Sequence, residues 1–163
     1  MPSSETIGVV GQYLSFTLGE EVYGIDVLKV QEIRGWEEVR PLPDTPDYVK
    51  GVLDLRGAIV PIIDMRLRFN LTDAEYTATT VTIILNVETH EKTHMIGIVV
   101  DGVSDVLDIQ EQDVKEAPSL GGNIDTRYIL GMVSKDDHVV LLLDADNLLD
   151  PDELLSLDIE NGD

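Results

Sequence analysis

Two stretches of the sequence repeat each other and indicate the fold: GIDVLKVQEI (residues 24–33) returns later in the chain as GIVVDGVSDV (residues 97–106). The shared positions hold a glycine and apolar residues in the same order and at the same spacing: Gly24, Ile25, Val27, Val30 and Ile33 correspond to Gly97, Ile98, Val100, Val103 and Val106. A second block also recurs at one constant spacing, where Tyr48, Gly51, Val60 and Asp64 correspond to Tyr128, Gly131, Val140 and Asp144. Two blocks that recur in the same order predict an internal duplication.

The apolar composition favours strands, because Val, Ile and Leu number 53 against 8 aromatic residues. Each copy holds about five short strand-like segments, which predicts a small barrel that protects its own edges. We therefore expect a mainly β fold in a single domain over residues 1–163, with one barrel over 13–70 and a second over 80–146. Short helices join the strands, and a capped start at Asp150-Pro151-Asp152-Glu153 predicts a C-terminal helix over 147–158.

Charge and cysteine content exclude several function classes. The 32 acidic and 11 basic residues leave a net charge of -21, which repels nucleic acids and anionic lipids. The sequence has no cysteine, so disulfides, thiolate zinc sites and cysteine nucleophiles are absent. The apolar runs 95–100 and 139–143 are too short to span a bilayer, and the first residues lack a basic signal region. We expect a cytoplasmic protein without direct membrane insertion.

One enzymatic pattern is present as a string of residues. His90-Glu91-Lys92-Thr93-His94 matches the H-E-x-x-H pattern of zinc hydrolases. That chemistry requires a helix, because only there do two histidines at positions i and i+4 reach one metal ion. The pentapeptide instead joins two β-branched runs, 81–87 and 95–100, which predicts a hairpin loop whose side chains diverge. A zinc hydrolase using His90, Glu91 and His94 is therefore the weaker alternative, and we expect no cofactor, metal or catalytic residue.

The basic residues gather in one part of the chain. Six of the 11 fall between positions 34 and 68: Arg34, Arg40, Lys50, Arg56, Arg66 and Arg68. Six acidic residues balance them, so this segment is neutral within an acidic chain. Such a cluster indicates either an ordinary solvated surface or a contact zone. Arg56 is the strongest candidate for contact, because it lies at the turn between two apolar strands and offers a planar fork to a carboxylate.

Several segments together resemble the CheW coupling proteins of bacterial chemotaxis. The resemblance lies in residues 13–26, VLKVQEIRG (27–35), KGVLDLRG (50–57), IVPIID (59–64) and residues 97–106, and it runs in unbroken order from Gln12 to Leu149. One departure is Asp54, where the family usually has asparagine. The resemblance implies a single CheW-like domain with two SH3-like five-stranded β-barrels. It also implies a non-enzymatic adaptor that joins the cytoplasmic tips of chemoreceptors to the histidine kinase CheA.

The resemblance further implies two binding surfaces. A helical hairpin of the receptor would lie in a groove between the barrels, formed by Val27, Val30, Val99, Val103 and Val106 with Arg56 close by. The kinase would contact the first barrel around Glu32, Ile33, Arg34 and Val39, with Val81 nearby. The protein would then act in chemoreceptor arrays, which it joins through protein contacts. A generic SH3-like module that binds peptides of another pathway is the remaining alternative.

Overall fold

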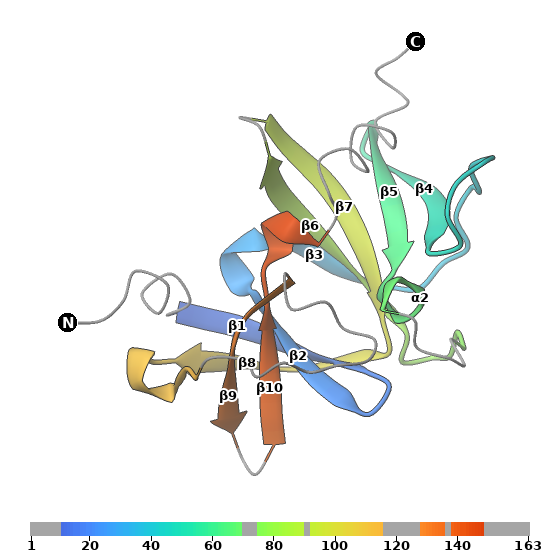
Figure 1. Cartoon of the computed structure of the whole chain (residues 1–163). Helices are drawn as coiled ribbons and strands as arrows, with labels where there is room; N and C mark the ends of the chain where they lie inside the picture. Colours follow the sequence, from blue (N-terminus) through green and yellow to red (C-terminus); the bar gives the residue numbers. More distant parts are fainter. Residues whose placement is uncertain (1–10, 70–74, 90–91, 116–127, 136–137, 149–163) are drawn as a thin grey trace.

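The computed structural model describes residues 11–69, 75–89, 92–115, 128–135 and 138–148, which form two five-stranded sheets packed on each other (Figure 1). Sheet A has the order β8-β1-β2-β10-β9, and sheet B has the order β3-β6-β7-β5-β4. The strands of sheet A are β1 (Gly11–Leu18), β2 (Glu21–Asp26), β8 (Gly102–Ile109), β9 (Ile129–Lys135) and β10 (His138–Leu143). Those of sheet B are β3 (Val30–Gly35), β4 (Val49–Leu55), β5 (Ala58–Asp64), β6 (Val81–Thr89) and β7 (Lys92–Val100). The expected mainly β fold with two SH3-like five-stranded units is confirmed.

The two sheets do not follow the two copies of the repeat. Each sheet takes the first hairpin of one copy and the last three strands of the other, because β2 pairs in parallel with β10 and β7 pairs in parallel with β5. The expected barrels over 13–70 and 80–146 are therefore wrong in their boundaries. The chain leaves sheet A at the short 3₁₀ helix η1 (Val27–Lys29), where the Asp26 carboxylate accepts a hydrogen bond from the Leu28 amide at 2.9 Å.

The repeated glycines are explained by close contacts between strands. A side chain at Gly51 would place its Cβ 2.0 Å from the Arg40 carbonyl oxygen, and φ at Gly51 is +147°. Its counterpart Gly131 faces Val114 and Lys115 in the same way, with Val114 Cγ1 at 2.8 Å from the Cβ position. Both contacts accompany an isolated bridge that closes a barrel: Arg40 pairs with Val52, and Lys115 pairs with Met132.

Both copies end their last strand in the same way. The amide of Asp64 donates to the Tyr48 carbonyl at 2.7 Å, and the amide of Asp144 donates to the Tyr128 carbonyl at 2.9 Å. Asp64 then caps the helix α2 (Met65–Arg68), and Asp144 caps the 3₁₀ helix η4 (Ala145–Asn147). The internal duplication thus extends from residue identity to local hydrogen bonding.

The described residues form three hydrophobic clusters. The largest, called the shared core below, lies between the sheets and contains residues of both, among them Phe16, Tyr23, Ile83 and Leu141. A smaller cluster fills each barrel, around Tyr13 and Leu142 in sheet A and around Ile62 and Val99 in sheet B. Each sheet therefore packs apolar side chains on both of its faces, and the shared core holds the two barrels in one body.

Two of the expected segments fall partly or wholly outside the described residues. Of the predicted C-terminal helix at 147–158, only residues 147 and 148 are described, at the end of η4. His90 and Glu91 are also outside, but β6 and β7 pair up to Thr89 and Lys92, so a hairpin joins them as expected. The remaining helix within the described ranges is η2 (Glu111–Asp113), a 3₁₀ turn that follows β8. None of the helices in the described part of the chain is long and apolar enough to cross a membrane.

Candidate functional site

The β8 edge, defined as Val103, Asp105, Val106 and Asp108, is an outer strand of sheet A with exposed apolar side chains. Val103 and Val106 are 36% and 52% exposed. In the register of the sheet they lie opposite Phe16 and Leu14, which belong to the shared core. Since directly opposite residues share one face of a sheet, the two valines extend the apolar surface of the shared core outward to solvent. An exposed apolar edge of this kind can receive a partner.

Three other residues assigned to the receptor groove are less available than the β8 edge. Val27 and Val30 are half-buried and pack against the shared core. Val99 is fully buried inside the barrel of sheet B, so its side chain cannot touch a partner. The physical reason is that β7 is an inner strand with both faces covered: Val100 points into the shared core while Val99 points into the barrel. Val99 is therefore removed from the candidate surface.

The β3 edge, defined as Glu32, Ile33 and Arg34, lies on one of the two outer strands of sheet B. Ile33 is 43% exposed, and the Glu32 carboxylate lies 3.2 Å from the Arg34 guanidinium. Val81, opposite Gly35, is half-buried against the shared core, and Val39 is half-buried against the cluster inside the barrel. The residues assigned to the kinase contact therefore lie in one region around β3, with Ile33 as its exposed apolar member.

Arg56 belongs with the β3 edge. It lies in the turn between β4 and β5 with φ +53°, and its exposed guanidinium lies 3.6 Å from Glu32. Barrel closure brings the β4–β5 turn next to β3, which places Arg56 beside Glu32. The same turn explains why Asp54 can replace asparagine: its carboxylate accepts a hydrogen bond from the Gly57 amide at 2.9 Å, as an asparagine oxygen would.

Sequence reasoning missed a buried charge network around Arg66, which it placed among the surface cations. Arg66 is 3% exposed and donates to both carboxylate oxygens of Asp64 at 2.9 Å and to Asp101 at 2.9 Å. Tyr76 also donates to Asp64, at 2.8 Å. Burial by itself lowers the pKa of Arg66, but its hydrogen bonds to Asp64 and Asp101 and their charges outweigh this and raise the pKa. Arg66 therefore stays charged and joins α2 to the end of β7.

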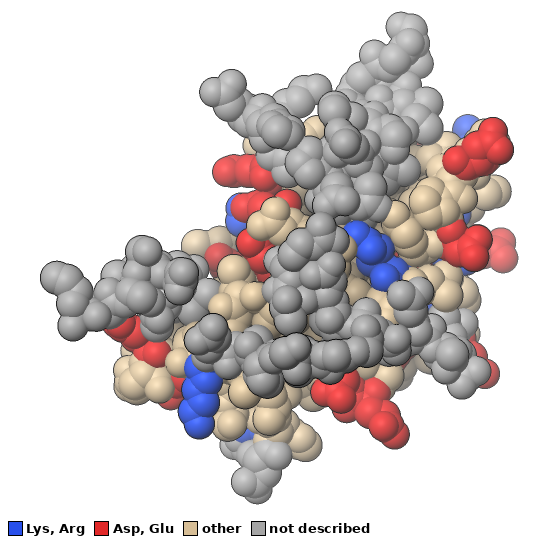
Figure 2. All heavy atoms as spheres, in the orientation of Figure 1, with Lys and Arg blue, Asp and Glu red and all other residues tan. Residues whose placement is uncertain are grey.

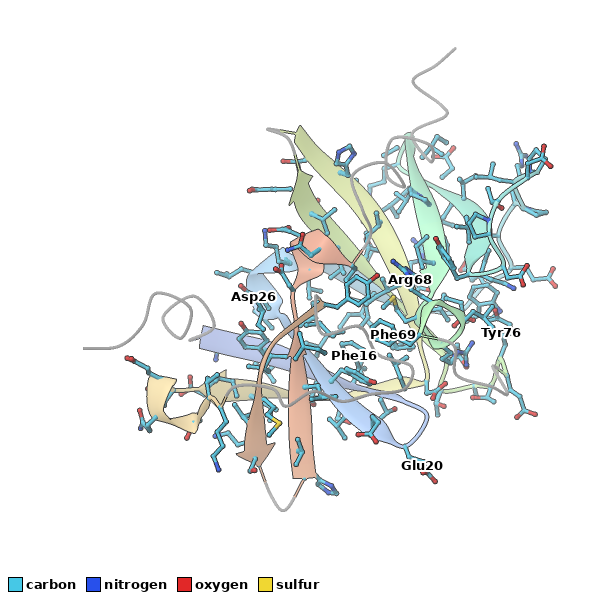
Figure 3. All side chains as sticks on the ribbon, in the orientation of Figure 1. Phe16, Glu20, Asp26, Arg68, Phe69 and Tyr76 are labelled. Carbon is cyan, nitrogen blue, oxygen red and sulfur yellow. The ribbon has the colours of Figure 1, made fainter. Side chains whose placement is uncertain are left out.

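Arg68 is a second cation that the fold withdraws from the surface cluster. Its guanidinium lies 5.0 Å from the ring of Tyr48 and 5.1 Å from that of Tyr128, the two tyrosines related by the repeat. Figure 3 shows Arg68 and Phe69 at the C-terminal end of α2, where the two sheets meet. The contact-zone hypothesis for the six basic residues therefore does not hold for Arg66 and Arg68, because their interactions are internal. No local signal distinguished them from the exposed Arg56.

The metal-site pattern has no structural support in the described residues. His94 lies in β7 opposite Val87, within a strand and not on the helix that H-E-x-x-H chemistry requires. Across the described ranges, no group of three or more His, Cys, Asp or Glu side chains is arranged to hold a metal ion. In the described part of the chain, the exposed features include the two edges, the apolar side chain of Leu28 in η1, and an acidic surface on which the red patches are more extensive than the blue ones in Figure 2.

Comparisons with known proteins agree on one family. The model of the CheW-like domain matches residues 12–153. The chemotaxis protein CheW of Klebsiella aerogenes is 43% identical over 156 residues, which cover 96% of this chain and 90% of that protein. CheW of Treponema pallidum is 38% identical over 152 residues, covering 90% of this chain and 86% of that protein.

A solved structure has the same fold at a lower sequence identity. The crystal structure of the scaffolding protein TtCheW from Thermoanaerobacter tengcongensis superposes with a TM-score of 0.77 at 27% sequence identity, covering 94% of this chain and 91% of that one. The relatives are chemotaxis scaffold proteins and not enzymes, which removes the zinc hydrolase alternative. With its two sheets, its exposed edges and these matches, the chain belongs to the CheW-like family and is a chemotaxis adaptor.

Proposed function

We propose that this protein couples chemoreceptors to the histidine kinase CheA, with the receptor on the β8 edge and the kinase on the β3 edge. The observation that carries the proposal is the exposure of Val106 and Ile33. These two residues are equivalent in the repeat, yet they lie on the outer strands of different sheets. An adaptor that touches two partners at once needs two separate apolar surfaces, and this chain has one on each sheet.

The receptor surface in this proposal consists of Val103 and Val106, together with Val27 and Val30, which pack against the shared core. The kinase surface consists of Glu32, Ile33 and Arg34, with Val39, Val81 and Arg56 at its border. Receptor and kinase would meet the protein in the cytoplasm, beside the membrane that carries the receptors. Membership of the family and the separation of the two edges support this assignment.

The proposed mechanism involves no chemical step by the adaptor. A receptor can change kinase activity only if its signalling states differ in free energy through contacts that reach the kinase. The shared core supports such a relay, because residues of both sheets pack in one continuous cluster. If the receptor displaces the β8 edge, the packing of the shared core either resists this displacement or transmits it to β3.

Two single substitutions test the separation of the surfaces. Val103→Asp should weaken binding of a receptor cytoplasmic fragment, because the new carboxylate must lose water against an apolar partner, while binding of the CheA regulatory domain persists. Ile33→Asp should give the reverse result. Val139→Asp is a matched control, since Val139 is an exposed valine on β10 outside both edges. Calorimetric titration against each partner measures the affinities, and circular dichroism establishes that the variants are folded.

The proposal fails if folded Val103→Asp and Ile33→Asp lose both affinities in parallel, because the surfaces would then not be separate. Binding of proline-rich peptides in place of receptor and kinase would instead support the generic SH3-like alternative.

A further inference from the structure

The two edges occupy equivalent positions in the repeat but carry different charge. On the β3 edge, Glu32 is balanced by two arginines: Arg34 at 3.2 Å and Arg56 at 3.6 Å. Its counterpart in the second copy is Asp105, on the β8 edge. In the same alignment of the copies, the counterparts of Arg34 and Arg56 are Leu107 and Asp136. The second copy of the repeat therefore has the acid but neither of the cations that neutralise it in the first.

The strands beside the β8 edge supply no positive charge that could balance its acids. Neither β8, nor its neighbour β1, nor the next strand β2 contains a lysine or arginine. Asp105 and Asp108 are exposed, and within the described residues neither carboxylate forms an ion pair. The Asp108 carboxylate accepts a hydrogen bond from the Gln110 side chain, at 3.2 Å, which adds no positive charge. This negative field therefore has no internal compensation in that part of the molecule.

The acids lie in the same short strand as the exposed valines. Val103 and Val106 flank Asp105, and within the described part of the chain β8 pairs on one side only, with β1. A partner that covers Val103 and Val106 must also remove water from the neighbouring carboxylates. That removal is unfavourable unless the partner supplies hydrogen bonds and opposite charge. Lysine or arginine next to aliphatic side chains meets both requirements.

We propose that the partner of the β8 edge is a chemoreceptor segment that presents aliphatic side chains flanked by lysine or arginine. This inference rests on the proposed function and adds the chemistry of the partner. Charge complementarity makes the receptor contact sensitive to salt. The kinase contact at the β3 edge is much less so, because Glu32 is already paired within the protein.

The test uses the full chain and the purified cytoplasmic fragment of a chemoreceptor from the same organism. The dissociation constant of the complex between the two is measured by calorimetry in about 0.1 M and about 1 M NaCl. Between these concentrations the Debye length falls from ~10 Å to ~3 Å. We expect binding to weaken by about tenfold or more at high salt, as screening removes the attraction between exposed charges.

The variant Asp105→Asn/Asp108→Asn removes the two charges and keeps the oxygen that accepts from Gln110. It should bind the receptor fragment more weakly at low salt and lose most of the salt dependence. Asp105→Lys/Asp108→Lys should weaken low-salt binding further. Glu20→Gln/Glu21→Gln is the matched control, because it removes two exposed charges at the tip of the β1–β2 hairpin, and it should retain the salt dependence.

The outcomes separate this inference from the proposed function. Binding that is equally strong at both salt concentrations, or unchanged in the double asparagine variant, overturns the inference and leaves the receptor role intact. Calcium binding that is lost in this variant also overturns it, because the acids would then serve a metal. Failure of the unmodified protein to bind the receptor fragment at either salt concentration overturns both.

Discussion

The two copies of the repeat build the same junction with opposite arrangements of charge. In one junction, Arg66 is the second residue of α2, the helix that Asp64 caps. Its guanidinium pairs with Asp101 at 2.9 Å. In the other, Asp146, at the position equivalent to Arg66, pairs with Lys29 at 3.1 Å. In each case the aspartate of the pair also accepts a hydrogen bond from a β-hairpin amide, Gly19 to Asp101 at 2.7 Å and Glu88 to Asp146 at 2.8 Å.

Burial distinguishes these two junctions. In the first junction the side chains of Arg66 and Asp64 are almost completely buried and Asp101 is 34% exposed, whereas in the second junction Lys29 and Asp146 are 26% and 32% exposed. A buried charge whose partner is removed has no water to replace the lost interaction, but a partly exposed charge does. The comparison teaches that equivalent positions in the fold can hold ion pairs of very different energetic weight.

The largest effect is expected from Arg66→Ala. Removing the guanidinium leaves the buried Asp64 without two of its hydrogen bonds and without its counter-charge, so we expect the free energy of unfolding to fall by about 3–5 kcal/mol. Arg66→Met, which keeps an apolar stem and also removes the charge, should be destabilised as well. Urea denaturation measures both. A loss below about 1 kcal/mol for Arg66→Ala would contradict the difference between the junctions.

A smaller effect on stability is expected at high pH from the buried Tyr13. This tyrosine lies close to Asp144, the capping residue of the second junction. Burial, with the charges of Asp26 and Asp144, raises the pKa of Tyr13 from 10.0 to about 12. Between pH 10 and 12 the unfolded chain therefore loses this proton while the folded protein keeps it, and stability falls as pH rises. The loss from Tyr13 should approach about 2 kcal/mol near pH 12.

Tyr13→Phe has no proton to lose and should reduce this alkaline loss of stability. Thermal unfolding of both proteins between pH 8 and 12 provides the measurement. Identical pH profiles would show that Tyr13 is not responsible.

Tyr76→Phe probes the buried junction with a milder change. The hydroxyl donates to Asp64 at 2.8 Å, so its removal should cost about 1–2 kcal/mol, while the ring stays stacked on Trp36 at 4.3 Å. Trp36 is the single tryptophan of the sequence and reports on this region by fluorescence during denaturation. Unchanged stability would mean that the Arg66 contacts satisfy Asp64 without Tyr76.

The smallest effect is expected from Lys29→Ala, at about 0–1 kcal/mol, because both partners of the ion pair retain contact with water. High salt should remove the difference in stability between Lys29→Ala and the unmodified protein, since screening acts on exposed charges. Denaturation at low and high NaCl concentration measures it, with Arg66→Ala as the reference that salt does not rescue. A loss for Lys29→Ala as large as that for Arg66→Ala would abolish the distinction between the junctions.

The residue pattern was sufficient for the local structure. The β-branched runs around His90 to His94 predicted the β6–β7 hairpin, and the repeats predicted two equivalent units. Resemblance to CheW coupling proteins identified the family. These features depend on neighbouring residues and on turn chemistry, which a sequence carries directly.

The tertiary structure alone decided which hairpin joins which sheet, and with it the position of several side chains. The spacing between the copies of the repeat is the same whether β2 pairs with strands of its own copy or with β10, so periodicity could not reveal the exchange. The same pairing buries Val99, places Arg56 beside Glu32 and encloses Arg66 between two aspartates. Burial and charge pairing are set by contacts between distant residues, and the identity of a residue does not reveal which others will surround it.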